Sequence, residues 1–475
     1  MVRIPVAALA LAALACGAPG LNLKYYQSLN ERVERDDFDG ARKKLKESKD
    51  LYGEKSRLVW HMDHAMIEHL AGDPAASNRQ IDAAERTIEE LYAKSLTREA
   101  VSFLTSDAVL NYQGEDFERV FLNVLGALNY AMLGQPDEAI VEAKRADLKL
   151  TERARTHKES PYAEDAFVRY LMGLVYEGGG ETNDAWISYA RAVATYEKQA
   201  KPFGVGVPQG LVRRAAAVAA RLSFREELEA LRTRYPDLVP ADAAAVPPEA
   251  GTGRLVVVEM AGMVPAKVEN RIELTLAAGL PFLTAQQVES KEESDVSSAL
   301  TVARSVAGTH NIVIAFPTMK ARPPASTPMR VHVDGAIEPG VGSAAAAETV
   351  HSLGAIAPKV LEERMGVIWG RTVARAVVKF LLAYAASKAG EAAGGKDYGW
   401  LVGFLAGAAT SAALGASEHA DTRQWGTLPY EVRLVVLDLP PGAHRVSVTS
   451  GGWQKDLGEV AVKPGGTAWR VVRTR

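Results

Sequence analysis

The sequence lacks a second cysteine: Cys16 is the one thiol among 475 residues. A single cysteine excludes an intrachain disulfide, so the folded regions must be held together by packing. The chain also lacks an excess of one charge, because 55 lysines and arginines nearly balance 58 aspartates and glutamates. This balance argues against the basic surface of a nucleic-acid-binding protein, and we expect no nucleic-acid partner. The length favours two or three domains.

A short apolar segment precedes the cysteine. Arg3 is followed by an uncharged run over residues 4–14, which is too short to cross a bilayer as a permanent helix, so residues 1–15 are predicted to be an export signal. Residues 11–17, Leu-Ala-Ala-Leu-Ala-Cys-Gly, resemble the lipobox of bacterial lipoproteins. In that motif the cysteine thiol is joined to diacylglycerol and the signal is removed.

The lipobox resemblance implies a lipid anchor on Cys16 and a lipidated tether over residues 16–24. Gly17 is not the aspartate that commonly marks retention in the inner membrane, which favours the periplasmic face of the outer membrane. Acyl chains contribute about 0.8 kcal/mol per buried methylene, so such an anchor is stable. Ala13 and Leu14 stand in the reverse of the usual order, and an ordinary secretory signal with an incidental cysteine is the alternative.

Residues 25–235 have the pattern of a helical repeat region. Alanine-rich amphipathic stretches alternate with short turns, such as 72–74, 134–136 and 178–180. Two windows resemble the tetratricopeptide repeat (TPR), with small or aromatic residues at the expected spacing: Ala127, Tyr130, Gly134, Ala139, Ala143 and Ala146, then Gly173, Tyr176, Gly180, Ala185, Tyr189 and Ala192. We predict an irregular TPR-like solenoid whose concave groove binds another protein. A plain helical bundle without a groove is the alternative.

The histidine-rich segment within this region invites a metal interpretation. Helical spacing places His61, His64 and Glu68 on one face, and such side chains can bind zinc. However, the spacing departs from the known helical zinc signatures by one residue. We favour a solvated helix face and predict no metal site.

A linker is predicted over residues 236–253, which are rich in proline and alanine, and a small β-rich domain over 254–354. Strand-forming runs occur at 254–260, 311–316 and 329–333. Residues 290–309 are polar and loosely patterned, so strand, loop or short helix all stay open for them. No residue set in this domain resembles a catalytic dyad.

Residues 355–416 are predicted to form a helical hairpin. Its first helix covers 355–389, and its second, over 398–416, contains no charge. Small residues recur every four positions along the second helix: Gly399, Gly403, Gly407, Ser411 and Gly415. This face permits close packing on the first helix, and contact with the membrane is the alternative. Between the helices, residues 390–397 approach a phosphate-binding loop but end in Asp397 where a hydroxyl is needed, so we expect no nucleotide or other cofactor.

The last segment, 417–475, is predicted to be a small antiparallel β module, with strands near 431–437, 444–449, 458–462 and 468–472. Asp421, Arg423 and Trp425 precede the first strand. They could form a ligand site, but an aspartate–arginine pair capped by tryptophan more often locks a domain junction, and we favour that interpretation.

The order of these parts resembles a family of functionally uncharacterised bacterial TPR lipoproteins of the outer membrane. Its most specific parts here are Arg-Thr-Val-Ala-Arg-Ala at 371–376 and Ala-Asp-Thr-Arg-Gln-Trp at 420–425. The resemblance covers nearly all of the mature chain and brings no activity with it. It implies a role in the cell envelope and, more weakly, partnership with outer-membrane lipoproteins and with cell-wall synthesis.

We therefore predict an α+β multidomain protein: an N-terminal α-helical TPR-like solenoid, a middle β-rich domain with a helical hairpin, and a C-terminal antiparallel β module. The favoured function is a non-enzymatic scaffold that is anchored to the membrane through Cys16 and binds other envelope proteins in the helical groove. Two alternatives stay open. One is a periplasmic hydrolase acting on peptidoglycan or peptide, and the other is a secretion or pore component that uses the helix over 398–416.

Overall fold

The computed structural model describes residues 23–95, 110–157, 160–239, 251–276, 310–325, 327–333, 344–393 and 419–475. Most of the helices lie in the N-terminal half and the strands lie in the C-terminal half, so the chain is α+β, as predicted. Several predictions lie outside the described residues: the export signal, Cys16, most of the tether and of the linker, the strand, loop or helix over 290–309, and the small residues of the helix over 398–416.

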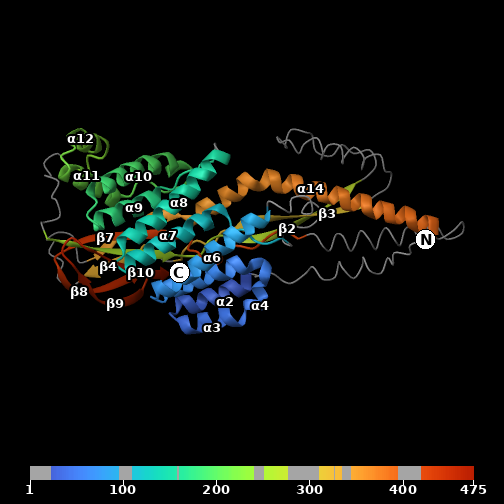
Figure 1. Ribbon diagram of the computed structural model, residues 1–475, viewed down its shortest axis with the longest axis horizontal. Helices are drawn as coiled ribbons and strands as arrows, with labels where there is room; N and C mark the ends of the chain where they lie inside the picture. Colours follow the sequence, from blue (N-terminus) through green and yellow to red (C-terminus); the bar gives the residue numbers. More distant parts are fainter. Residues whose placement is uncertain are drawn as a thin grey trace.

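The N-terminal half consists of helices that follow one another through short turns (Figure 1). They are α2 (Leu23–Glu34), α3 (Phe38–Glu47), α4 (Lys49–Tyr52), α5 (Arg57–Leu70), α6 (Pro74–Ser95), α7 (Asp116–Met132), α8 (Pro136–Thr156), α9 (Ala166–Gly178), α10 (Thr182–Phe203), α11 (Gln209–Arg221) and α12 (Arg225–Arg234). Gly72, Gly134 and Gly180 occupy the turns after α5, α7 and α9 with φ of 79°, 71° and 86°. These left-handed conformations favour glycine, which confirms the three predicted turns.

Small residues bring the helices of each hairpin close together. On α8, the side chains of Ala139, Ala143 and Ala146 are buried in the core shared with α7. On α9, a Cβ at Gly173 would lie 2.2 Å from the Tyr189 ring of α10, so no larger residue fits there without movement. The spacing of small residues in the sequence therefore correctly indicated closely packed helical hairpins.

The strands are β1 (Gly253–Ala261), β2 (Ala266–Leu276), β3 (His310–Lys320), β4 (Arg330–Val333), β5 (Ala344–Ala346), β6 (Glu348–Ser352), β7 (Glu431–Leu439), β8 (Gly442–Ser450), β9 (Trp453–Val462) and β10 (Thr467–Thr474). Each predicted strand overlaps one of these elements. The sequence analysis missed β2, β5 and β6. β2 places Glu269, Arg271 and Glu273 at alternate positions, so its apolar content is low.

Strands from the middle and C-terminal segments share two four-stranded sheets, with orders β10-β1-β7-β6 and β5-β4-β8-β9. In the first, β1 pairs in parallel with β10, with Arg254 opposite Thr467, and in antiparallel with β7, with Gly253 opposite Leu439. Strands predicted for a β-rich domain at 254–354 and for an antiparallel module at 417–475 thus lie together in shared sheets, a point that the sequence alone left open. Alternation along a strand shows that it has two faces but not which strand lies beside it.

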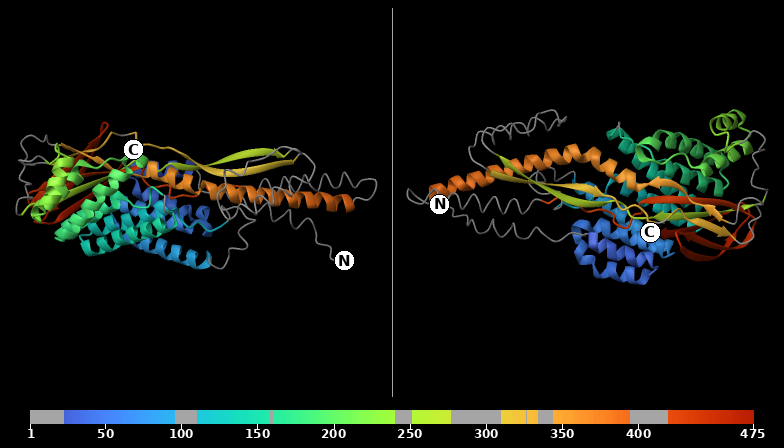
Figure 2. Two further views of the ribbon diagram at one scale, coloured as in Figure 1. Left: turned by 90° about the horizontal axis from the view of Figure 1, so that it is seen from above. Right: turned by 180° about the vertical axis from the view of Figure 1, so that it is seen from behind.

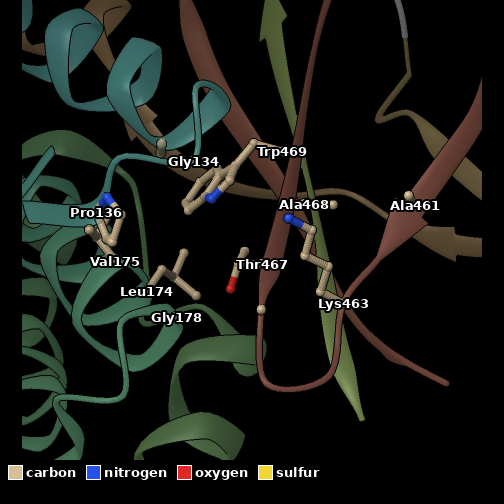
Figure 3. A pocket seen from close by; sticks show the side chains of 12 residues that line it. Gly134, Pro136, Leu174, Val175, Gly178, Ala461, Lys463, Thr467, Ala468 and Trp469 are labelled. Carbon is tan, nitrogen blue, oxygen red and sulfur yellow. The ribbon is translucent and has the colours of Figure 1, made fainter. Parts of the chain in front are cut away.

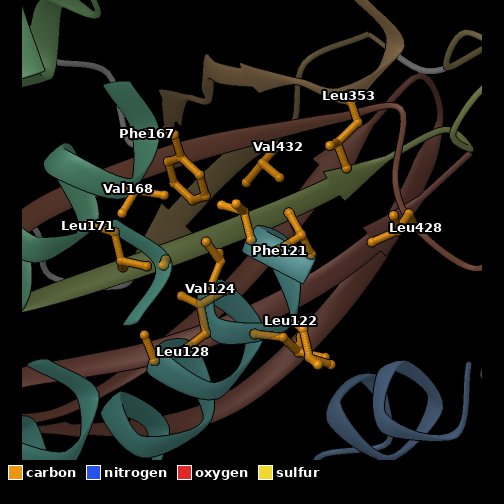
Figure 4. Close-up of a cluster of buried hydrophobic side chains, with 14 of the residues drawn as sticks. Phe121, Leu122, Val124, Leu128, Phe167, Val168, Leu171, Leu353, Leu428 and Val432 are labelled. Atoms are coloured by element: carbon orange, nitrogen blue, oxygen red, sulfur yellow. The ribbon is translucent and has the colours of Figure 1, made fainter. Parts of the chain in front are cut away.

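The helices and the two sheets form three layers, and β1 is buried on both of its faces. Val256, Val258 and Met260 pack with the helices, whereas Leu255 and Val257 pack with the second sheet. Figure 4 shows side chains of α7 and α9, including Phe121 and Phe167, directed toward Val432 of the first sheet. Buried apolar area of this extent is the main source of stability for such a fold.

A β-hairpin and a long helix form an arm that projects from the layers. The strands β2 and β3 pair from Ala266–Lys320 to Leu276–His310, and α14 (Leu353–Ala393) lies along β3. Both views in Figure 2 show the hairpin and α14 side by side. Phe316 of β3 packs on Trp369 of α14, with ring centroids 4.8 Å apart. The first helix of the predicted hairpin is confirmed as α14.

Candidate functional site

The candidate residues Asp421, Arg423 and Trp425 lie in residues 419–430, which we call the strap. The strap contains no helix or strand and leads into β7. Asp421 and Arg423 form the predicted ion pair, because Asp421 Oδ1 and Oδ2 each accept a 2.8 Å hydrogen bond from the Arg423 guanidinium. Asp421 Oδ1 also accepts the Arg423 backbone N–H at 3.0 Å, which fixes the local turn.

Arg423 connects the strap to two earlier segments of the chain, one just before α5 and one before α7. Its Nη1 donates to the carbonyl oxygens of Lys55 at 3.2 Å and Leu110 at 2.7 Å. The Tyr112 ring lies beneath the guanidinium, with its centroid 5.3 Å from Cζ, a cation–π contact. The aromatic cap is thus Tyr112. Trp425, which we expected there, is instead buried in the core, because the strap turns it toward the helices.

Glu118 of α7 holds the strap through its backbone. Its Oε1 accepts the Trp425 backbone N–H at 2.7 Å, while Oε2 accepts the Tyr112 hydroxyl at 2.7 Å and the Glu115 backbone N–H at 3.0 Å. Burial, together with the nearby negative charge of Glu115, raises the pKa of Glu118 to about 7.

Asp63 of α5 holds the next turn of the strap. Its Oδ1 accepts the Thr427 hydroxyl at 2.8 Å and the Thr427 backbone N–H at 3.2 Å. Its Oδ2 accepts the hydroxyls of Tyr52 at 2.8 Å and Tyr26 at 3.1 Å. Burial raises the pKa of Asp63 to about 7, even though all four donors favour the ionised form. The Trp425 indole N–H donates to Thr427 Oγ1 at 3.0 Å.

A third buried acid, Glu115, connects α7 to the arm. Its carboxylate forms ion pairs with Lys267 of β2 and Arg364 of α14. Burial opposes ionisation, but the charges of Lys267 and Arg364 outweigh it and lower the pKa of Glu115 to about 2. The strap joins this group because the Lys267 backbone N–H donates to Gln424 Oε1 at 2.5 Å.

We call Asp63, Glu115 and Glu118 the acid junction. Its carboxyl groups bind donors from the helices, the arm and the strap, so its chemistry is that of a structural lock between segments far apart in the sequence. The sequence analysis favoured a lock near Asp421 and Arg423 but missed these acids. A signal existed, because Asp63 and Glu118 interrupt the apolar faces of α5 and α7, where a charge is costly unless it is paired.

A second buried carboxylate joins the helices to the first sheet. Glu177 of α9 binds Arg214 and Arg221 of α11 and Arg254 of β1 at 3.2, 2.8 and 2.7 Å, and it accepts the Tyr189 hydroxyl at 2.7 Å. Burial opposes ionisation, but the guanidinium charges dominate and lower the pKa of Glu177 to about 2. This cluster is likewise a structural lock.

His61 and His64 of α5 are partly buried, so this helix face is less solvated than the favoured interpretation supposed. His61 Nδ1 lies 3.0 Å from Gln80 Oε1, and His64 Nε2 lies 3.3 Å from Glu68 Oε1. Glu68 is itself paired with Arg42 at 2.6 Å. Within the described part of the chain, no group of three or more histidine, cysteine, aspartate or glutamate side chains is placed to hold a metal ion.

The described residues leave at least two concavities open at the surface. A groove of about 640 Å³ lies between α10 and α12, lined by Trp186, Ala190, Val193, Ala194, Ala215, Glu227, Ala230, Leu231, Thr233 and Arg234. A cavity of about 280 Å³ lies where the turn between β9 and β10 meets the helices (Figure 3). Neither involves the strap, so the predicted candidate residues do not line either concavity.

Comparison with known proteins finds no family model and no curated protein that matches the chain. The resemblance to TPR lipoproteins therefore stays a prediction. Among the helices of the described residues, none combines the length and apolar character needed to span a bilayer.

Proposed function

We propose that this protein is a non-enzymatic scaffold of the bacterial cell envelope, held at the periplasmic face of the outer membrane by lipid on Cys16. In this proposal the helices α2 to α12 act as a degenerate TPR array that binds another envelope protein. The observation that best supports it is the groove between α10 and α12, where the last hairpins leave apolar side chains partly uncovered.

The groove has an apolar floor and a charged rim. Val193 is buried and Trp186 and Leu231 are partly buried, whereas Glu227 and Arg234 are exposed. A surface of this kind suits an amphipathic helix, whose apolar side chains enter the groove while its polar side chains meet the rim. The alanines that line the groove keep it open to a partner's side chains.

The buried acids favour this proposal over the hydrolase alternative. A hydrolase using two carboxyl groups needs them in an open cleft that admits substrate and water. Glu115 and Glu118 are three residues apart on one turn, but both are buried and bonded to protein donors. The pore alternative depends on the helix over 398–416, which lies outside the described residues.

The groove can be tested by charge insertion. Full-length protein with a tag after Arg475 would be purified from crosslinked envelopes in three forms: wild type, Ala194→Arg and Leu51→Arg. Ala194 lines the groove, and Leu51 is an apolar residue of α4 that is 41% exposed outside it. We expect Ala194→Arg to lose a partner that wild type and Leu51→Arg retain. Retention of every partner by Ala194→Arg would refute the groove.

The tether can be tested by fractionation. We expect Cys16→Ala to move the protein from the membrane fraction to the soluble periplasm with its circular dichroism spectrum unchanged. A Cys16→Ala variant that stays on the membrane would refute lipid anchoring without bearing on the groove.

A further inference from the structure

The cavity beside the β9–β10 turn has walls of two kinds. The helices contribute an apolar wall that includes Ala131, Leu174 and Val175. The sheet contributes Thr467 and Trp469 from β10, and Lys463 from the turn. Figure 3 shows the indole nitrogen and the Thr467 hydroxyl on the side of β10 that faces Leu174, and the Lys463 side chain rising from the turn across the β10 ribbon from them. The lining residues include no acid.

Three polar groups that line this cavity have no hydrogen-bond or ion-pair partner among the described residues. Thr467 Oγ1 is buried and has no hydrogen-bond partner. Among the described residues, the Trp469 indole N–H and the Lys463 ammonium also form no hydrogen bond or ion pair. A buried hydroxyl without a partner costs free energy, and a bound acceptor would recover it.

The glycines around the cavity preserve this arrangement. A Cβ at Gly178 would lie 2.7 Å from Thr467 Oγ1, so glycine leaves the hydroxyl its space. On the sheet side, a Cβ at Gly253 would lie 2.2 Å from the Lys463 carbonyl oxygen, so glycine allows the turn to approach β1. The turn is fixed by hydrogen bonds from Gly465 N to the Thr252 carbonyl and from Gly466 N to the Lys463 carbonyl, both 3.0 Å.

We propose that this cavity binds the carboxyl terminus of a peptide whose last side chain is apolar. The carboxylate accepts hydrogen bonds from the Thr467 hydroxyl and the Trp469 indole and pairs with the Lys463 ammonium. The last side chain packs against Leu174 and Val175.

The chemistry of the lining selects this ligand. An ammonium and an indole N–H are donors without acceptor capacity, so they call for an acceptor, and the ammonium favours an anion. A phosphate would satisfy the donors but leave the apolar wall unused. A free amino acid carries an ammonium of its own, and the lining side chains contain no carboxylate to pair with it. The C-terminal residue of a peptide has no such ammonium, because its nitrogen is part of an amide bond.

The test uses matched ligands and the full-length protein in detergent, measured by isothermal titration calorimetry. The probes are acetyl-Ala-Ala-Leu, the same peptide with a C-terminal amide, and free leucine. We expect the acid to bind and the amide to bind about tenfold more weakly, because it loses the charge-assisted bonds. Equal binding of acid and amide, or no binding of the acid, would overturn the proposal. Free leucine binding as well as the peptide would overturn the peptide assignment.

Substitutions locate the binding. We expect Lys463→Met and the nearly isosteric Thr467→Val each to weaken binding of the acid several-fold, with little change for the amide. Gly178→Ala should weaken both by crowding the cavity. Lys46→Met, which removes an exposed ammonium on α3, is the matched control and should change neither. Unchanged acid binding in both Lys463→Met and Thr467→Val would place the site elsewhere. This site is separate from the α10–α12 groove, so either can fail alone.

Discussion

We predict that the acid junction makes the stability of this protein fall as pH rises toward neutrality. The pKa of Asp63 rises from 3.8 in the unfolded chain to about 7 in the folded protein, and that of Glu118 rises from 4.5 to about 7. Between these values the folded protein keeps protons that the unfolded chain releases. Its free energy of unfolding therefore decreases as pH increases through this interval.

The size of the effect follows from the pKa values. A tenfold change in proton affinity corresponds to about 1.4 kcal/mol, so Asp63 contributes about 4 kcal/mol and Glu118 about 3 kcal/mol of lost stability by pH 8. Glu115 and Glu177 act in the opposite sense, since their pKa values are lowered to about 2. Their stabilisation is present above pH 4.5 and is lost as pH falls toward 2. Stability should therefore be greatest between pH 4 and 5.

Replacing Asp63 with asparagine isolates the contribution of Asp63 to the loss of stability with rising pH. The amide oxygen can still accept from Thr427, and the tyrosine hydroxyls can turn to accept from the amide nitrogen, but the group cannot ionise. Urea unfolding of the full-length protein, followed by tryptophan fluorescence from pH 4.5 to 8, should show that Asp63→Asn loses more than half of the wild-type decline. Asp39→Asn, at a carboxylate that is 98% exposed, is the control.

Two outcomes would contradict this reasoning. Wild-type stability that is constant or rises between pH 5 and 7 would show that the four donors to Asp63 outweigh its burial. A decline that Asp63→Asn leaves unchanged would assign the titration to other groups.

Two further substitutions test the packing of the helices. Gly173→Ala places a Cβ 2.2 Å from the Tyr189 ring, so we expect about 2 kcal/mol of destabilisation by overpacking, seen as a lower midpoint in thermal unfolding. Arg254→Met removes one of the cations around the buried carboxylate of Glu177, and we expect a loss of about 3 kcal/mol in urea unfolding. Variants as stable as wild type would contradict these assignments.

Local structure was largely predictable from the sequence because it depends on neighbouring residues. Glycines at 72, 134 and 180 indicated turns that only a left-handed conformation closes easily, and alternation indicated most of the strands. The pairing of β1 with β10 was not predictable, since it joins Arg254 to Thr467 across more than two hundred residues. Hydrophobic alternation fixes a strand's faces but leaves its neighbours unspecified.

The candidate site was predictable in part for the same reason. Asp421 and Arg423 are two residues apart, so their ion pair is a local contact. The cation–π partner of Arg423 is Tyr112, more than three hundred residues earlier. The sequence analysis chose Trp425 for this role because it is only two residues from Arg423. Asp63 and Glu118 come close to the strap only through the tertiary fold. Their position on apolar helix faces was visible, but their partners were not.

The sharing of core and sheets determines how the proposed groove must be probed. Deleting residues 25–235 would remove Phe121 and Phe167 from the apolar core that covers Val256 and Trp469 of the first sheet. The same deletion would remove the acids that hold the strap. Loss of a partner from such a deletion would therefore report unfolding as readily as loss of a binding surface. Single substitutions at exposed positions such as Ala194 keep this core intact, so a partner lost with them can be assigned to the groove.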